Sequence, residues 1–304
     1  MQVGDDPVLV WGQPAAHFCL GQHQSIAAEL VTDVSVPVIC RPLGGGGVWL
    51  DRYQVCLVLV APRAFFPQRT QDWYAHALAP MLQVYAEMGW HASLVAQDVS
   101  LNGKKIAGTG AASIGVAGLV GTSFLLKFPV HEFTRLIAVP SEGYRIWLGD
   151  ALQAAITTWS DYAELPELTW LSLVYRRAAA GIFDWRWEQA LLREDERAAR
   201  DDYRIELIPE VNKQTKLIPY GIKINARSFL TERDFEGEWV RICTHDQTIA
   251  RIALSAMVGL PEHVLCDVTP TQMDISHKLS QFFPTDLAQL WTQRVLMTAY
   301  FAEE

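Results

Sequence analysis

Two adjacent lysines follow a predicted tight turn and could hold an anionic group. Asn102-Gly103 lies between two short apolar runs, and this dipeptide is the strongest short-range signal for a β-hairpin turn. The turn places Lys104 and Lys105 at the start of a strand, where successive side chains point to opposite faces. The lysine that faces inward could hold a phosphate or a carboxylate as a point charge. The alternative is that both lysines belong to a solvated turn.

A run of four glycines, Gly44, Gly45, Gly46 and Gly47, lies between two apolar stretches rich in valine. Glycine loses more backbone freedom on folding than any other residue, so four in a row oppose folding. Two interpretations fit: a mobile surface loop, or a backbone that lies flat against a ligand. In the second interpretation, amide N–H groups are free to hold an anion or a carbonyl oxygen.

The standard phosphate-binding motifs do not account for these glycines. A P-loop requires a lysine and a hydroxyl residue after its last glycine, but Val48, Trp49 and Leu50 follow Gly47. A second glycine-rich segment, GTGAASIG at residues 108–115, lacks the G-x-G-x-x-G spacing of a dinucleotide fingerprint. Both motifs are therefore excluded.

The composition predicts a globular protein with a sizeable core. The chain has 304 residues, of which 50% are hydrophobic and 19% charged, and its formal net charge is −9. It has no cluster of lysines or arginines, which argues against a nucleic-acid partner. It shows neither a signal-peptide pattern nor an apolar run of about 20 residues, so we expect a cytoplasmic protein without a membrane-spanning segment. The five cysteines lack C-x-x-C spacing, which favours reduced thiols over disulfides or a zinc site.

Hydrophobic patterning predicts strands that alternate with helices. Valine-rich runs bounded by turn residues predict strands at residues 8–12, 36–40, 53–61 and 91–96. Apolar residues at helical spacing predict helices at residues 70–90, ending at Gly89, and 285–302.

The chain is expected to divide after a charged segment. Residues 185–202 are rich in Arg, Glu and Asp and predict a connecting helix. Strand-like sequence follows, at residues 203–230 and 236–243. We therefore expect one domain over residues 1–202 and a smaller one over residues 203–304.

Three motifs together resemble the lipoate–protein ligase family. CRPLGGGGVWLD (40–51) is similar to the family signature RRxxGGGAVxHD, and LGQHQSIAAEL (20–30) resembles G-R-x-Q-x-x-x-x-E. NGKKIAGTG (102–110), with Asp98 upstream, is similar to the second family signature. The motifs occur in the family's order and cover about residues 8–150. The resemblance implies an α/β (α+β) fold of the biotin/lipoate ligase type, with a mixed β-sheet flanked by helices and a smaller C-terminal domain.

The resemblance also implies roles for individual residues. Lys105 matches the lysine that contacts the acyl-adenylate, and Asp98 matches the acidic residue near it, so these two are the expected catalytic residues. Lys105, Gly45 and Gly46 are the expected nucleotide-binding residues. The expected substrate-binding residues are Arg41, Gly44, Gly45, Gly46, Gly47, Val48, Gly108 and Thr109.

The implied reaction has two steps. A carboxylate, lipoate or octanoate, attacks the α-phosphate of ATP with Mg²⁺ present, and a lysine of a lipoyl carrier domain then takes the acyl group. Activation needs charge neutralisation, which a lysine, backbone amides and magnesium supply. Val38, Val48 and Trp49 offer apolar walls, and burial of the acyl chain is worth about 0.8 kcal/mol per methylene.

Four positions depart from the family pattern and leave two other functions open. Cys40 and Gln22 stand where the family has arginine, Leu50 stands where it has histidine, and Val120 replaces the histidine of a later HG pair. One alternative is a non-catalytic paralogue that binds lipoylated protein or regulates a ligase. The other is an ATP-independent lipoyl or octanoyl transferase.

The cysteines and histidines offer little support for other chemistry. The transferases use a cysteine located after the signature lysine, but no cysteine lies between Cys56 and Cys243. Cys40 is the one candidate for a substitute nucleophile, and its thiolate would need a nearby cation such as Arg41. Free cysteines are mostly buried small hydrophobic residues, which favours a structural role for Cys40. His245 with Asp246 suggests a catalytic triad, but no G-x-S-x-G elbow accompanies them, which favours a structural role.

Overall fold

The computed structural model describes residues 5–206, 216–255, 261–266, 268 and 270–301. Contacts divide the chain into two compact units: residues 1–129 with 156–213, and residues 130–155 with 214–304. Helices α3 (Val130–Leu136) and α4 (Glu142–Ala155) thus belong to the second unit. The expected domain boundary between residues 202 and 203 stays a prediction. The mixed α/β fold that the motifs implied is confirmed.

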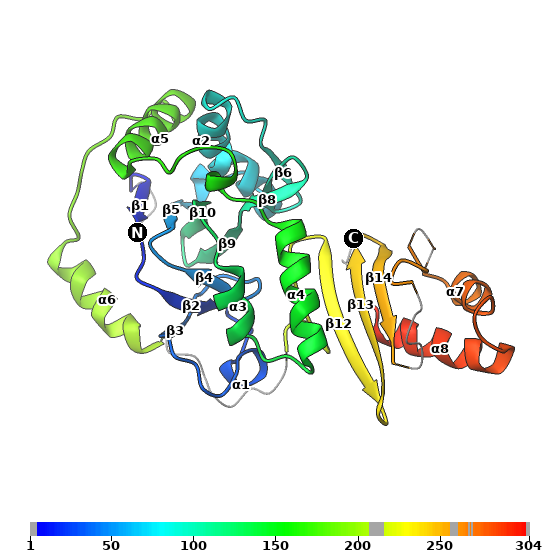
Figure 1. The fold of residues 1–304 in the computed structure, drawn as a ribbon. Helices are drawn as coiled ribbons and strands as arrows, with labels where there is room; N and C mark the ends of the chain where they lie inside the picture. The colour runs from blue at the N-terminus through cyan, green and yellow to red at the C-terminus, as the bar shows by residue number, and fades with distance from the viewer. Residues whose placement is uncertain (1–4, 207–215, 256–260, 267, 269, 302–304) are drawn as a thin grey trace. The chain divides into compact units, whose positions relative to one another are not determined.

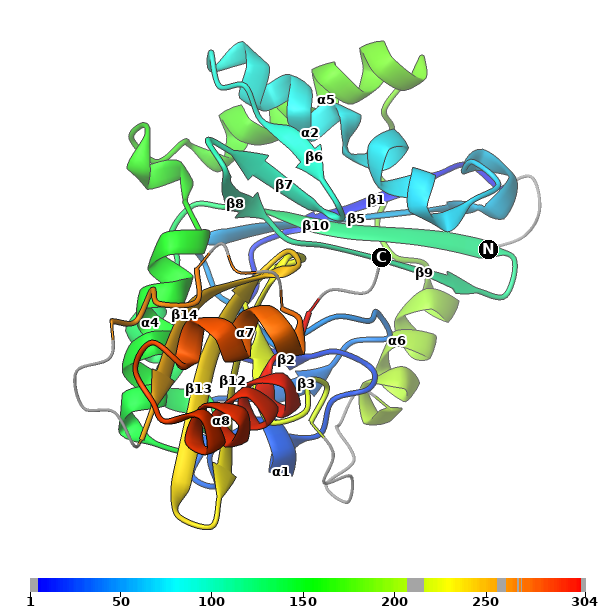
Figure 2. The ribbon, with the colours of Figure 1, turned by 90° about the vertical axis from the view of Figure 1, so that its right-hand side faces the viewer.

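The first unit is built on a four-stranded antiparallel sheet in the order β1-β5-β10-β9. Its strands are β1 (Val8–Gly12), β5 (Gln54–Pro62), β10 (Ala117–Leu125) and β9 (Thr109–Ile114). Helices α2 (Trp73–Glu87) and α5 (Leu168–Phe183) cover one face (Figures 1 and 2).

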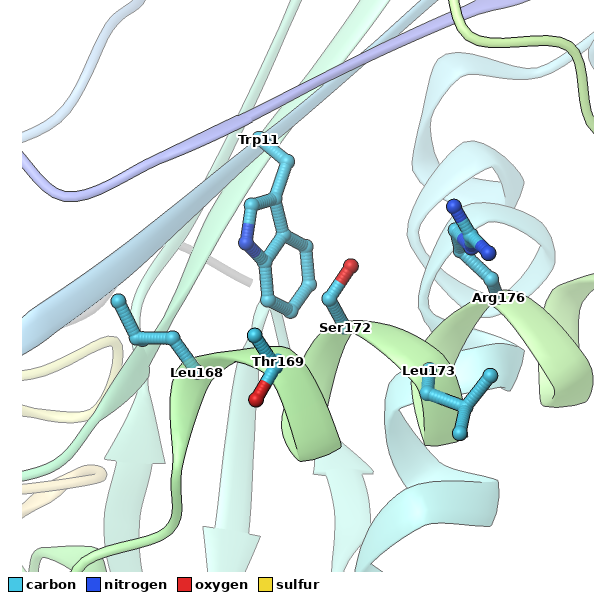
Figure 3. Close-up of a pocket in the computed structure, with 6 residues that line it drawn as sticks. All are labelled: Trp11, Leu168, Thr169, Ser172, Leu173 and Arg176. Atoms are coloured by element: carbon cyan, nitrogen blue, oxygen red, sulfur yellow. The ribbon is translucent and has the colours of Figure 1, made fainter.

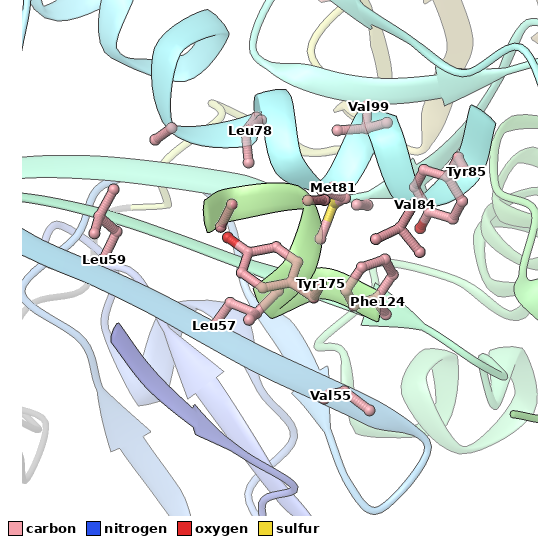
Figure 4. Packing of buried hydrophobic residues seen from close by; sticks show 14 of the residues in the cluster. Val55, Leu57, Leu59, Leu78, Met81, Val84, Tyr85, Val99, Phe124 and Tyr175 are labelled. Atoms are coloured by element: carbon pink, nitrogen blue, oxygen red, sulfur yellow. The ribbon is translucent and has the colours of Figure 1, made fainter. Parts of the chain in front are cut away.

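That covered face forms the main core. The side chains of β5 alternate, and Val55, Leu57 and Leu59 are buried against both helices. Figure 4 shows these residues beside Met81 of α2 and Tyr175 of α5. The period-two alternation of a strand leaves the next residues, such as Val58, on the opposite face.

Two three-stranded sheets complete this unit. One has the order β3-β2-β4, with strands β2 (His17–Leu20), β3 (Val38–Cys40) and β4 (Val48–Leu50). It lies on the side of the large sheet away from α2 and α5 (Figures 1 and 2). The other has the order β6-β7-β8, with strands β6 (Ser93–Val95), β7 (Asp98–Leu101) and β8 (Lys104–Ala107). The remaining elements are α1 (Ile26–Glu29), α6 (Glu194–Glu206) and 3-10 turns at Arg63–Phe65, Thr70–Asp72 and Trp159–Asp161.

The second unit packs helices on an antiparallel sheet in the order β11-β12-β13-β14. Its strands are β11 (Gly221–Lys223), β12 (Ser228–Phe235), β13 (Glu238–His245) and β14 (Thr248–Leu254), and its later helices are α7 (Gln272–Leu279) and α8 (Thr285–Thr298). Arg241 forms a buried ion pair with Glu232 at 2.5 Å and donates to Ser141 Oγ at 3.0 Å. Tyr144 of α4 donates to the Leu230 carbonyl at 2.8 Å. These bonds join α4 to the sheet, although α4 lies far from it in the sequence.

Most predicted elements of the first unit are confirmed, and one is wrong. The predicted helix at residues 70–90 appears as α2, and Gly89 follows it with a left-handed φ of +77°. The predicted connecting helix begins only at residue 194, because Trp185 and Trp187 pack against the core instead. Residues 203–206, predicted as strand, are the last turn of α6, and residues 207–215 lie outside the described part.

No helix among the described residues is both long enough and apolar enough to cross a bilayer.

Candidate functional site

The guanidinium of Arg41 shapes the glycine loop, residues 44–47. It donates to the carbonyl oxygens of Gly44 and Gly46 at 2.9 and 2.7 Å. It also donates to the carbonyl of Cys19 on β2 at 3.0 Å. The planar guanidinium spreads five donors in a fixed fork and so reaches carbonyls of two separate segments, whereas the three donors of a lysine sit on one nitrogen. Arg41 therefore supports the loop through its backbone.

The four glycines have different reasons to lack a side chain. Gly45 has a φ of +94°, a left-handed conformation that favours glycine. A Cβ atom on Gly47 would lie 2.5 Å from the ring of Phe18, which is fully buried. A Cβ atom on Gly44 or Gly46 would meet nothing within 4 Å, and neither residue has a positive φ. No contact with the residues that the structure describes thus requires glycine at these two positions, and they present bare backbone.

A second loop presses against the glycine loop from the end of β2. A Cβ atom on Gly21 would lie 2.2 Å from the carbonyl oxygen of Gly45, so only glycine fits. The N–H of Gln22 donates to the Leu43 carbonyl at 3.1 Å. Gln24 accepts from the Gly21 N–H at 3.0 Å. The motif at residues 20–30 and the glycine motif at residues 40–51 therefore form one continuous backbone surface.

The predicted hairpin is present and joins Lys105 to Asp98. Asn102 and Gly103 have φ values of +52° and +78°, as a tight hairpin turn requires. Lys105 Nζ lies 2.8 Å from Asp98 Oδ1, and these side chains are 24% and 13% exposed. Strand alternation places Lys104 on the opposite face of β8. Of the two lysines, Lys105 is therefore the one that forms the site.

Gly108 and Thr109 follow the hairpin and close around Lys105. A Cβ atom on Gly108 would lie 3.3 Å from both Cε and Nζ of Lys105. The Gly108 carbonyl accepts from Thr122 Oγ1 at 3.0 Å, and the Thr109 hydroxyl donates to the Gln97 carbonyl. The absence of a side chain at Gly108 thus leaves space for the Lys105 side chain, and the hydroxyls of Thr122 and Thr109 stabilise the turn through their hydrogen bonds.

The residue before the glycine loop and Lys105 both lie against the start of β9. Leu43, next to the loop, contacts Gly110, and Lys105 contacts Gly108, only two residues away. The expected residues Arg41, Gly44, Gly45, Gly46, Asp98, Lys105, Gly108 and Thr109 therefore border one region of the first unit. Gly47 packs against Phe18 instead. Val48 and Trp49 are neighbours on β4 and face opposite sides, so they cannot both line one pocket wall.

Tyr74 on α2 is a site neighbour that the sequence analysis missed. Burial raises the pKa of its phenol, an N–H donated by Ala111 lowers it, and the charge of Asp98 raises it. Tyr74 thus contacts β9 and lies near Asp98. Helical spacing marks such a residue only as a core position, so no sequence signal distinguished it.

The departures from the family pattern have structural roles. Cys40 Sγ donates to the Gly21 carbonyl at 3.4 Å. Leu50 pairs with His17 on β2, and Val120 is 2% exposed in the core.

Cys56 is not a reactive thiol. Burial raises the pKa of its thiol to about 11, so it is protonated at neutral pH.

The suspected triad in the second unit is a structural cluster. Ser228 Oγ lies 2.8 Å from His245 Nδ1, but Asp246 is held by Arg227, which lowers the pKa of the Asp246 carboxyl. Ser228 is 7% exposed, so its hydroxyl is not presented to a substrate. No group of three His, Cys, Asp or Glu side chains that could hold a metal ion occurs among the residues described.

A separate pocket lies between β1 and the start of α5 (Figure 3). Its lining residues are Trp11, Leu168, Thr169, Ser172, Leu173 and Arg176. None of the expected site residues lines it, so it is distinct from the region around Lys105.

Comparisons with known proteins agree with this geometry. Residues 2–165 match the model of the lipoyl protein ligase A/B catalytic domain. The structure resembles a bi-partite lipoate protein ligase from Thermoplasma acidophilum, described with its E2 lipoyl domain, at 16% identity and a TM-score of 0.63 over 71% of this chain and 88% of that one. It also resembles lipoate-protein ligase A bound with ATP, at 16% identity and a TM-score of 0.56 over 67% and 83% of the two chains.

A third similar structure spans nearly the whole chain. It is LipL1 of P. falciparum in complex with lipoate, at 13% identity and a TM-score of 0.54 over 96% of this chain and 88% of that one. At these identities the structural matches show the shared fold. No curated protein sequence matches the chain significantly.

Proposed function

Because this chain belongs to the lipoyl protein ligase A/B catalytic-domain family, we propose that it attaches lipoate or octanoate to a lysine of a lipoyl carrier domain at the expense of ATP. The observation that carries the proposal is the Lys105–Asp98 pair at the start of β9, the strand that Leu43, next to the bare backbone of the glycine loop, also contacts. Relatives described with ATP, with lipoate and with a lipoyl domain support each of the three substrates.

In the first step, a carboxylate oxygen of the acid attacks the α-phosphorus of ATP, and the bond to the bridging oxygen breaks. Pyrophosphate leaves with that electron pair, and an acyl-adenylate remains. Lys105 stabilises the negative charge on the phosphate, and Asp98 holds the lysine in place at 2.8 Å. Amide N–H groups of the glycine loop are the further donors. Mg²⁺ arrives bound to the phosphate oxygens of ATP, as magnesium commonly does.

In the second step, the amine of the carrier lysine attacks the acyl carbon. An amide bond forms, AMP leaves with the electrons of the broken C–O bond, and the amine loses a proton. The protein contributes mainly by orienting the two reactants, which accounts for a large part of the barrier in such transfers. We assign the second unit an accessory role in this reaction.

The test is an acyl-transfer reaction followed by intact-mass measurement of a purified lipoyl domain. Wild-type protein with octanoate and Mg–ATP should add one octanoyl group to the domain, and a lipoyl domain with its acceptor lysine changed to arginine should stay unmodified. Transfer from an octanoyl thioester without ATP would instead show a transferase. Binding of the acid without any transfer would show a non-catalytic paralogue.

A further inference from the structure

Leu43, the residue directly before the glycine loop, lies against the face of the four-stranded sheet that points away from α2 and α5. A Cβ atom on Gly110 would lie 3.3 Å from Leu43 Cδ1, and one on Gly121 would lie 3.2 Å from the same atom. Gly110 and Gly121 are cross-strand partners on β9 and β10. The leucine side chain therefore occupies the space that two neighbouring side chains would otherwise fill.

A row of small and apolar residues extends from this point across the sheet. Gly121 pairs with Val58 on β5, and Val58 pairs with Val10 on β1. Cross-strand partners share a face, so this row crosses all four strands on the side away from α2 and α5. Val10 is 55% exposed, and Val58 is only partly buried. The face away from α2 and α5 thus carries an apolar track, the row Val10, Val58, Gly121 and Gly110, that ends at Leu43.

The backbone at Leu43 and at the residue after it is anchored by hydrogen bonds. Its own carbonyl accepts the Gln22 N–H at 3.1 Å, and the next carbonyl, that of Gly44, accepts from Arg41 at 2.9 Å. Anchored backbone fixes the direction in which the leucine side chain projects. Its position over Gly110 and Gly121 is therefore a fixed feature of this part of the fold.

We propose that Leu43 is a specificity-determining residue that limits the chain length of the acid. This inference rests on the proposed function. An acyl chain whose carboxylate lies at Gly44 and Gly46 reaches the apolar track past Leu43, so the leucine side chain and the chain compete for the same space. A smaller residue leaves room for a longer acid, and a larger one shortens the acid that fits.

The test is calorimetric binding of hexanoate, octanoate, decanoate and dodecanoate to the wild type, Leu43→Ala and Leu43→Phe. The space released by Leu43→Ala holds about two methylene groups, so we expect the preference for dodecanoate over hexanoate to rise about tenfold. Leu43→Phe should shift the preference toward hexanoate. Leu43→Met, which conserves volume, should keep the wild-type profile, and Leu43→Phe still tests the proposal if the alanine variant is unstable.

Leu191→Ala is the matched control, since Leu191 is 84% exposed and outside this region. An unchanged chain-length profile in Leu43→Ala and in Leu43→Phe, with acids still bound, would overturn the role of Leu43 and leave the proposed function intact. If no acid binds to any protein in the series, both the role of Leu43 and the acyl site itself are refuted.

Discussion

Alanine substitutions at Gly46 and Gly47 should separate ligand contact from internal packing. A methyl group at Gly47 would lie 2.5 Å from the buried ring of Phe18, which must then shift within a packed interior. Such overpacking costs about 1–3 kcal/mol of unfolding free energy. A methyl group at Gly46 meets nothing within 4 Å, and the residue lacks a positive φ. There the loss of unfolded-state freedom should stabilise the protein by about 0.4–1 kcal/mol.

Ligand binding should show the opposite order. If the bare backbone at Gly46 contacts the acyl head group, the added methyl displaces the head group by about 1 Å. Besides weakening binding, a misplacement of that size costs about 100-fold in the rate of acyl transfer. We expect Gly46→Ala to unfold at or above the wild-type temperature and to bind the acid far more weakly. Gly47→Ala should unfold at a lower temperature.

Differential scanning calorimetry and isothermal titration with octanoate measure the two effects on the same samples. Gly181→Ala on α5 is the control, because its Cβ atom also meets nothing within 4 Å and it is remote in sequence from the loop. Wild-type affinity in a folded Gly46→Ala variant would refute the idea that this glycine faces the ligand.

Three further predictions concern the supports of the site and the fold. Arg41→Lys should weaken acid binding about tenfold in titrations, because the single nitrogen of a lysine does not span the three carbonyls that the guanidinium fork reaches. Equal affinity would show that the loop holds its own shape. Arg241→Ala should lower the unfolding free energy in urea by about 3–5 kcal/mol, because it leaves Glu232 buried and unpaired, whereas Arg200→Ala at an exposed pair should change it by less than about 1 kcal/mol. Burial raises the pKa of the Cys56 thiol from 9.0 to about 11, so the thiol contributes to the free energy of unfolding below pH 9.0 and this contribution is lost as the pH rises toward 11. The free energy of unfolding of Cys56→Ala should therefore fall less steeply than that of the wild type between pH 9.0 and 11, and parallel curves of unfolding free energy against pH would contradict this.

The hairpin that carries Lys105 was predictable because its signal is local. Asn102-Gly103 specifies a turn by backbone conformation alone, and strand alternation then separates the faces of Lys104 and Lys105. The pairing of Lys105 with Asp98 needed the family resemblance, since spacing alone did not reveal it.

The different roles of the four glycines could not be read from the sequence. They depend on groups distant in the chain, such as Phe18 beside Gly47 and the guanidinium of Arg41 on two loop carbonyls. Tyr74 was missed for the same reason, because its partners lie on other elements. The inclusion of α4 in the second unit likewise depends on the long-range contacts of Arg241.

The most direct test of the central claim is calorimetric titration of lipoate and octanoate, with and without Mg–ATP, into the wild type and Lys105→Ala. Lys104→Ala is the matched control, because Lys104 occupies the other face of the same strand. The account predicts that ATP tightens acid binding and releases pyrophosphate in the wild type and the control, and that Lys105→Ala loses both effects. Acid binding that is indifferent to ATP in the wild type would contradict activation of the acid at this site.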